Sequence, residues 1–148
     1  MNLQSKQNGF TLIEMIIVVA ILGILTSIAY YNYMKSVMKS NRTDAKTELA
    51  DLAQRMQRCY TANGTYATAA GVCTIIDELN SANGVATRGN FYVVSASNLT
   101  PTTYTLTATP APDSVQAKDT DCVRFVLNHR GNKSAQNKLL ADSTDKCW

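Results

Sequence analysis

A run of twenty residues, from residue 10 to residue 29, is almost entirely apolar and constrains the fold of this chain more than any other feature. As an α-helix that rises about 1.5 Å per residue, this run spans roughly 30 Å, the thickness of the hydrocarbon core of a bilayer. The alternative is a central helix buried in a soluble domain. A chain of 148 residues leaves too little protein to cover every face of such a helix. The run therefore predicts a membrane-spanning helix.

The segment ahead of this run, residues 1–9, is short and polar, with Lys6 as its only charge. An ordinary secretory signal is cut downstream of its hydrophobic region, so the cut removes the anchor. Here the plausible cut follows Gly9 and lies upstream of the apolar run. We therefore expect residues 1–9 to be a leader peptide and the apolar helix to remain attached to the mature chain.

Glu14 is the one acid within the apolar run. A carboxylate near the middle of a membrane span costs about 3 kcal/mol on insertion scales and usually has a partner. One interpretation is that Glu14 lies in the first helical turn, where the helix dipole favours an acid. After a cut behind Gly9, however, the new amine of Phe10 would lie within one turn of Glu14, in the same chain or in a neighbour. We favour a charge pair buried between packed subunits.

The segment Gly9-Phe10-Thr11-Leu12-Ile13-Glu14, followed by an apolar helix, resembles the class III signal of type IV pilins and related pseudopilins. The resemblance implies cleavage after Gly9 by a prepilin peptidase, N-methylation of Phe10, and a role for Glu14 in assembly. It also implies a single-pass protein of the bacterial inner membrane with a periplasmic head, later part of an extracellular pilus. Its partners would be major and minor pilin subunits, the peptidase, the inner-membrane assembly platform and, before assembly, membrane lipid. One departure is Tyr31, where many type IV pilins have a helix-kinking proline.

The helical pattern continues beyond the apolar run. Apolar residues recur there at helical spacing, with charged residues, Arg42 among them, largely between them. This pattern predicts a single helix from about Phe10 to about Tyr60, ended by Asn63-Gly64. The apolar positions are Met34, Met38, Ala45, Leu49, Leu52, Met56 and Tyr60.

The second half of the chain has a β pattern. Residues 91–94, 104–108 and 122–128 are rich in β-branched and aromatic residues, and prolines, glycines and asparagines separate them. A short helical turn is expected near residues 75–79. The sequence therefore predicts an α+β fold, in which a long N-terminal helix packs on a head of three or four antiparallel strands. The expected divisions are a leader (1–9), a membrane or filament-core helix (10–30) and a globular head (31–148).

The chain contains four cysteines, Cys59, Cys73, Cys122 and Cys147. An even number in a chain predicted to be exported favours two disulfides. Four cysteines allow three pairings and the sequence alone does not choose among them, although proximity in the chain favours Cys59 with Cys73 and Cys122 with Cys147. The segment from Cys122 to Cys147 also resembles the disulfide-bounded D-region of type IVa pilins. Zinc is disfavoured because the chain has no C-x-x-C pair and a single histidine.

No catalytic site, metal site or cofactor is predicted. His129 stands in a strand-to-turn segment without a recognisable nucleophile or acid beside it, which favours a surface position. Asp113, Asp119 and Asp121 lack the glycine turn of a compact calcium loop, so we expect a solvated loop. The sequence favours an interaction protein over an enzyme.

Weaker similarities extend along the rest of the chain. Residues 40–43, 60–66, 104–108 and 131–134, and the terminal Cys147-Trp148 pair, are most similar to the PilE-type minor pilins. This resemblance implies a low-abundance subunit that primes pilus assembly, is incorporated into the filament and supports twitching motility or adhesion.

Two alternatives remain open. One is a DNA-binding competence pilin for natural transformation, suggested by basic residues in the last third of the chain. An ordinary solubilising surface is the favoured explanation of those residues, because only Phe125 and Trp148 accompany them as aromatics, and DNA as a partner is therefore unsupported by the sequence. The other is a type II secretion pseudopilin, against which the two expected disulfides weigh. The basic residues are Arg124, Arg130, Lys133, Lys138 and Lys146.

Overall fold

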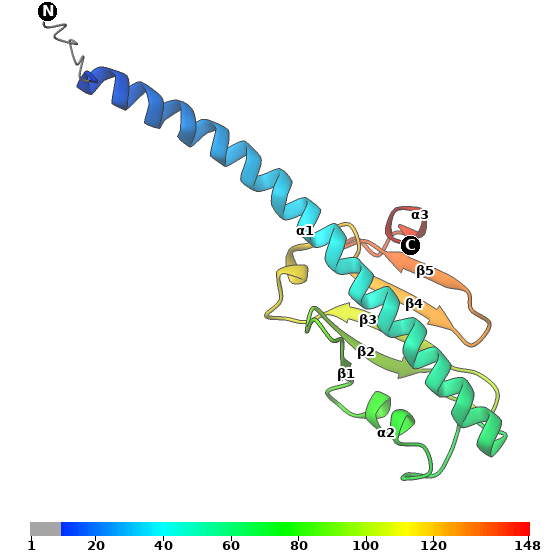
Figure 1. Cartoon of the computed structure of the whole chain (residues 1–148). Coiled ribbons are helices and arrows are strands. Elements are labelled where there is room, and N and C mark those ends of the chain that lie inside the picture. The colour runs from blue at the N-terminus through cyan, green and yellow to red at the C-terminus, as the bar shows by residue number, and fades with distance from the viewer. Residues whose placement is uncertain (1–9) are drawn as a thin grey trace, which may run out of the picture. The chain divides into compact units, whose positions relative to one another are not determined.

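The structure, a computed structural model, describes residues 10–148. The predicted leader, with Lys6 and Gly9, lies outside the described residues. The chain divides into two compact units, Met1–Val37 and Met38–Trp148. One helix, α1 (Leu12–Asn63), belongs to both units (Figure 1). The prediction of a single helix from about Phe10 to about Tyr60 is thus confirmed.

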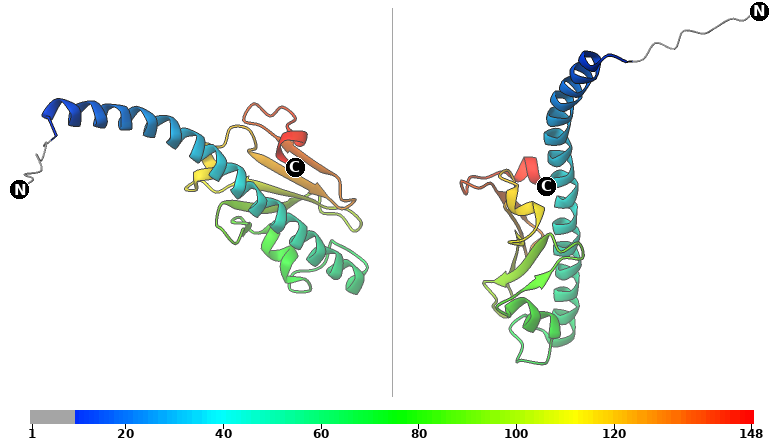
Figure 2. Two further views of the ribbon diagram at one scale, coloured as in Figure 1. Left: turned by 45° about the horizontal axis from the view of Figure 1, so that its top comes forward. Right: turned by 90° about the vertical axis from the view of Figure 1, so that its left-hand side faces the viewer.

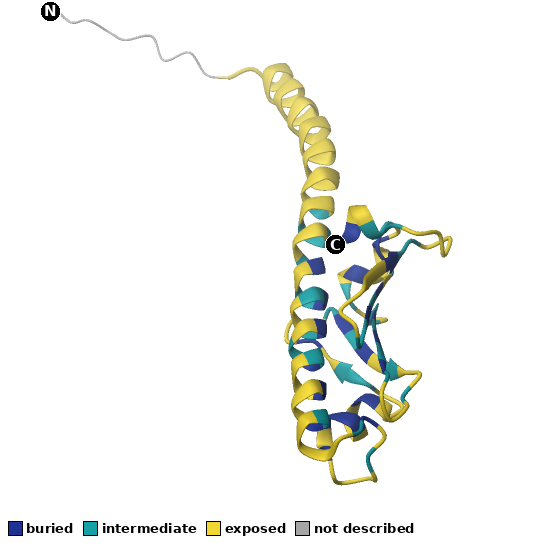
Figure 3. Cartoon of the chain, turned by 90° about the vertical axis from the view of Figure 1, so that its right-hand side faces the viewer, coloured by how far each residue is buried: buried dark blue, intermediate teal, exposed yellow. Residues whose placement is uncertain are grey.

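In the N-terminal unit, every residue from 10 to 33 is exposed (Figure 3). These exposed side chains include the whole apolar run, whose most apolar stretch has a mean hydropathy of 2.6. By length and composition this part of α1 is able to cross a membrane. A segment that exposes apolar side chains on all faces is unsuited to water and requires a covering partner.

The C-terminal unit packs one face of α1 against a five-stranded sheet (Figure 2). The strand order is β1-β2-β3-β4-β5, and every neighbouring pair is antiparallel. The α+β fold is therefore confirmed, with five strands where three or four were expected. The strands are β1 (Val85–Ala86), β2 (Tyr92–Ser97), β3 (Thr105–Pro110), β4 (Arg124–Asn128) and β5 (Lys133–Gln136), and the short helical elements are α2 (Thr74–Asn80), a 3₁₀ turn (Val115–Lys118) and α3 (Thr144–Cys147).

Two strands were missed because their sequences carry little β pattern. Strand β5 reads Lys-Ser-Ala-Gln and buries only Ala135, which pairs with Phe125 of β4. Strand β1 is two residues long and pairs with Val93 and Val94 of β2. Hydrogen bonding to a neighbouring strand, and not their own side chains, determines that these segments are extended.

The core of the head lies between α1 and the inward face of the sheet. Along β2, β3 and β4 the side chains alternate, so that Tyr92, Leu106 and Phe125 are fully buried. Ala45, Leu49, Leu52, Met56 and Cys59 of α1 are buried against them. The predicted helical stripe thus forms the core from Ala45 onward, while Tyr60 is only half-buried.

The end of α1 follows the predicted stop signal. Gly64 has a φ of +71°, a left-handed conformation that costs glycine little, and its N–H donates to the carbonyl of Tyr60 at 2.7 Å. Two disulfides lie in the same unit: Cys59 is bonded to Cys73, and Cys122 is bonded to Cys147. This is the pairing that proximity in the chain favoured. The first bond joins the last turns of α1 to the residue before α2, and the second joins the residues before β4 to α3.

Candidate functional site

The start of α1 is a capping box formed by Thr11 and Glu14. The backbone N–H and the hydroxyl of Thr11 donate to Oε2 of Glu14 at 2.8 and 2.7 Å, and the backbone N–H of Glu14 reaches the hydroxyl of Thr11 at 3.4 Å. Reciprocal bonds of this kind satisfy backbone donors that have no partner within the helix. The helix dipole also favours an acid in this first turn. Thr11 therefore fixes the position of the Glu14 carboxylate.

The Glu14 carboxylate remains available for a further partner. Glu14 and Phe10 are both exposed, and an ionised carboxylate has about four acceptor sites, so two bonds from Thr11 do not exhaust it. Together with Met15, Ile17 and Val18 they line a shallow, mostly apolar hollow in the N-terminal unit. The surface around Glu14 thus combines a held acid with apolar side chains that a neighbouring helix could cover.

A buried ion pair connects α1 to the segment before β4. It corrects the prediction of a solvated loop for Asp119, whereas Asp113 is exposed as expected and Asp121 is half-buried. Arg42 donates from Nε and Nη2 to the carboxylate of Asp119 at 2.7 and 2.9 Å, and both side chains are buried. Oδ1 of Asp119 also accepts the backbone N–H groups of Asp121 and Cys122. Asp119 is buried because Arg42 and these two amides replace the water that a lone carboxylate requires.

The predicted C-terminal basic residues differ in their surroundings. Lys146 is paired with Asp121 at 2.9 Å, and Arg124 donates to the side chain of Gln136 at 3.2 Å. Arg130 and Lys138 are exposed. Nζ of Lys133 lies 4.9 Å from the centroid of the Trp148 ring.

A different basic cluster is formed by Lys39, Lys46 and Lys133, of which Lys46 and Lys133 contact Trp148. Nζ of Lys46 donates to the backbone oxygen of Trp148 at 3.2 Å. The pKa of Lys46 is lowered, first by partial burial and then by the positive charges of Arg42, Lys133 and Lys39. The indole N–H of Trp148 donates to the carbonyl of Ser134 at 2.8 Å, so the ring is held in place. Sequence reasoning missed Lys39 and Lys46 because they are distant in the chain from Lys133.

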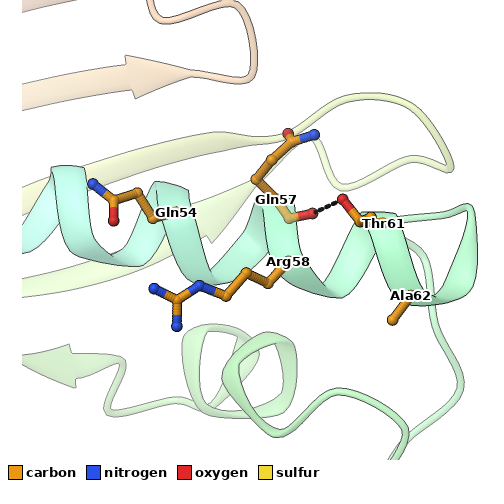
Figure 4. A pocket seen from close by; sticks show the side chains of 5 residues that line it. All are labelled: Gln54, Gln57, Arg58, Thr61 and Ala62. Atoms are coloured by element: carbon orange, nitrogen blue, oxygen red, sulfur yellow. Dashed lines mark hydrogen bonds between the residues drawn. The ribbon is translucent and has the colours of Figure 1, made fainter.

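The described residues offer no arrangement typical of catalysis. His129 is half-buried with its ring 6.3 Å from that of Tyr104, and residues 10–148 contain no group of three or more potential metal ligands among His, Cys, Asp and Glu. A recess on the last turns of α1 is lined by residues of that helix alone, and Thr61 donates to the backbone of Gln57 there (Figure 4). The lining residues are Gln54, Gln57, Arg58, Thr61 and Ala62.

Comparison with known proteins assigns the family. Residues 4–30 match the prokaryotic N-terminal methylation motif. This match agrees with the exposed apolar helix and the acid in its first turn. Residues 32–126 match the family described as "Type IV minor pilin ComP, DNA uptake sequence receptor". The chain belongs to this family of type IV minor pilins.

Individual relatives agree with this assignment. The chain is 44% identical to a "Probable minor fimbrial protein" of Dichelobacter nodosus over 36% of this chain and 34% of that protein. It is 36% identical to the "Type IV major pilin protein PilA" of Myxococcus xanthus over 59% of this chain and 36% of that protein. The matches thus span about a third of the length of these curated relatives.

A solved structure shares the fold. The minor pilin PilV of Neisseria meningitidis superimposes with a TM-score of 0.52 at 24% sequence identity, covering 69% of this chain and 89% of that one. At this identity the match establishes the pilin fold alone. The predicted fold, a long N-terminal helix packed on a small antiparallel sheet, is confirmed.

Proposed function

We propose that this chain is a minor subunit of a type IV pilus, anchored in a membrane before assembly and held in the filament afterwards by the first part of α1. One observation carries the proposal. Residues 10–33 expose a continuous apolar surface on all faces, although the head has a complete core of its own. Lipid, and then the helices of neighbouring pilins, are the partners that would cover such a surface. The proposed role is that of an interaction protein without catalytic activity.

The motif at the start of α1 supports a specific maturation. A prepilin peptidase would cut after Gly9, and Phe10 would become the methylated N-terminus. The amine of Phe10 would then pair with a Glu14 carboxylate, either in its own chain or in a neighbour, and desolvation between packed helices would strengthen the attraction. Thr11 would serve as a positioning residue, because it already holds that carboxylate.

The proposed location follows from the same segment. The chain would be inserted in the bacterial inner membrane with residues 31–148 as a periplasmic head, and would move to the extracellular pilus on assembly. Residues 10–30 would form the membrane and filament-core helix, and residues 1–9 the leader. The assembly platform and the major and minor pilins would be its partners, and the pilus would support motility or adhesion. The matched family and relatives are type IV pilins, which favours this role over that of a secretion pseudopilin.

Substitution of Glu14 tests the assembly role. Glu14→Gln keeps the shape of the side chain and the bond from Thr11 but removes the charge, so the chain should stay in the membrane and largely disappear from sheared filaments. The matched control is Glu78→Gln, at an exposed acid of α2 in the head, which should be incorporated normally. Equal incorporation of both variants would contradict the proposed pair.

DNA binding is a second candidate function, which two observations favour. The matched family is described as a DNA uptake sequence receptor. The cluster formed by Lys39, Lys46 and Lys133 brings together three cations, two of which contact Trp148. Partial burial lowers the pKa of Lys46, and the positive charges of Lys133 and Lys39 add to this effect. Lysines of this kind would contact the phosphates of DNA, and an aromatic ring beside them is a feature of nucleic-acid surfaces.

Gel-shift measurements on the full chain in neutral detergent test this second function. The double variant Lys46→Gln/Lys133→Gln should weaken binding to duplex DNA, and the slope of log affinity against log salt should become shallower by about 1 for each phosphate that a lysine no longer neutralises. Lys138→Gln is the control, because Lys138 is exposed outside the cluster. If the unaltered chain binds no DNA at low salt, the DNA function is refuted and the pilus role is unaffected.

A further inference from the structure

Three tyrosines and a lysine follow directly after the apolar run in the N-terminal unit. Tyr30, Tyr31 and Tyr33 are 64%, 62% and 65% exposed. Nζ of Lys35 lies 4.7 Å from the centroid of the Tyr31 ring, within cation–π distance. Three large aromatic side chains exposed within one turn of helix form a surface that is expected to have a partner outside the chain.

The position of these residues along α1 fits a membrane–water boundary. The 18 residues from Leu12 to Ala29 span about 27 Å as a helix, so Tyr30 begins where a hydrocarbon core of about 30 Å nears its end. Successive residues turn by about 100°, and the three tyrosines therefore spread over an arc of roughly 160° around the helix. Such a wide arc suits a lipid interface, which surrounds the helix, better than a single packed helix, which touches a narrow stripe.

The chemistry of the four side chains fits the same boundary. A tyrosine has an apolar ring and a polar hydroxyl, and tyrosines are enriched where acyl chains meet headgroups. A lysine can place its stem along the acyl chains and its ammonium among phosphates. The contact between Lys35 and Tyr31 keeps the cation beside the ring.

We propose that Tyr30, Tyr31, Tyr33 and Lys35 form an interfacial anchor that seats in the headgroup region of a phospholipid bilayer and fixes the depth of α1. The proposal rests on the membrane anchoring proposed above. It also gives Glu14 a defined place. Tyr30 follows Glu14 by sixteen positions, or about 24 Å of helix. The anchor therefore holds Glu14 close to the opposite interface and away from the bilayer centre, where a carboxylate is costly. The carboxylate then remains hydrated and ready for the amine of an incoming subunit.

The depth of α1 in phospholipid nanodiscs tests the proposal with the full chain. A nitroxide attached at Ser36→Cys, an exposed position just after the anchor, reports depth through its collisions with oxygen and with a water-soluble nickel chelate. In the variant Tyr30→Leu/Tyr31→Leu/Tyr33→Leu the apolar run is longer, and the label should move toward the bilayer centre by up to about one turn, roughly 5 Å. The matched control replaces the three tyrosines by tryptophan, which also prefers the interface and should leave the depth unchanged.

Equal label depth in the leucine variant and the unaltered chain would refute the anchor. If incorporation into filaments also falls in that variant, the tyrosines belong to a contact between subunits. A second label at Ile24→Cys, within the apolar run, should be shielded from the nickel chelate. Free access of the chelate to that label would refute the membrane span, whatever the Ser36 label shows.

Discussion

The two parts of α1 have the same backbone geometry and opposite surroundings. Leu22, in the first part, is 56% exposed, whereas Leu52, in the second, is fully buried. The difference lies in the pattern of the neighbours: the first part is apolar on every face, and the second is apolar on one stripe that packs on the sheet. The head therefore has a core of its own, whereas the first part of α1 exposes apolar side chains that no other described residue covers.

The largest loss of stability is expected when the ion pair between α1 and the segment before β4 is broken. Asp119→Ala removes the carboxylate that accepts two hydrogen bonds from the buried guanidinium of Arg42, and Asp121, at 3.8 Å, is then its remaining acid partner. It also leaves two backbone N–H groups without their acceptor. We expect the free energy of unfolding of the head to fall by about 3 to 5 kcal/mol, measured by chemical denaturation. Asp113→Ala, at an exposed acid, is the control and should change it by less than about 0.5 kcal/mol.

A double replacement separates the charge effect from packing. Arg42→Met/Asp119→Leu removes both charges and keeps the site apolar, so it should recover part of the stability lost in Asp119→Ala. The recovery should be incomplete, because the amides of Asp121 and Cys122 still lack an acceptor. A double variant less stable than Asp119→Ala would contradict this account of the pair.

Replacing a leucine by alanine should have different effects in the two parts of α1. Leu52→Ala opens a cavity in the head and should lower the free energy of unfolding by about 2 to 5 kcal/mol. Leu22→Ala should leave the unfolding of the head unchanged and reduce incorporation into filaments, because the proposed partners of Leu22 lie outside the chain. Similar effects of the two variants on head stability would mean that the first part of α1 also contributes to the core of the head.

The stability of the head should also decline at alkaline pH, because Tyr92 is buried. Burial raises the pKa of Tyr92 to about 12, against an ordinary value near 10, so folding favours the neutral phenol. The resulting stability is complete below about pH 10 and is lost as the pH rises through the folded pKa of about 12. Tyr92→Phe should therefore flatten the decline of head stability over this range. If the decline of head stability is the same in Tyr92→Phe, burial does not raise the pKa of Tyr92.

The smallest expected effect lies on the outward face of α1 within the head. Arg55 and Asp51 are one turn apart with a nitrogen–oxygen distance of 3.4 Å, and both side chains are about half exposed. Arg55→Ala should cost about 0.2 to 0.5 kcal/mol of unfolding free energy, and less at high salt. A loss above about 1 kcal/mol would show that this face of α1 contributes more than a solvated surface does.

Much of the fold was predictable because it depends on local patterns. The apolar run, the stripe from Ala45 to Met56, the stop at Gly64 and three of the strands all have local signals in their own residues. Strand β5 has no such signal, since its extended form depends on pairing with β4. Elements whose own residues carry a pattern can be predicted from the sequence, whereas a strand that depends on pairing with a distant strand cannot.

The surroundings of individual side chains were less predictable. The motif from Gly9 to Glu14 predicts an assembly site, but the bonds from Thr11 to Glu14 required the structure. The sequence pattern predicts surface positions for both Arg42 and Asp119, because the burial of each depends on a partner 77 residues away. The basic cluster was missed for the same reason: Lys46 and Lys133 meet only after α1 packs on the sheet.

The form of the chain present in sheared filaments tests the central claim most directly. Mass spectrometry of that material should find a chain that starts at N-methylated Phe10 and retains the whole exposed part of α1, since we propose that neighbouring helices cover this part. A filament-bound chain that starts beyond Tyr33 would contradict the account, because such a subunit would be held in the pilus without its apolar helix.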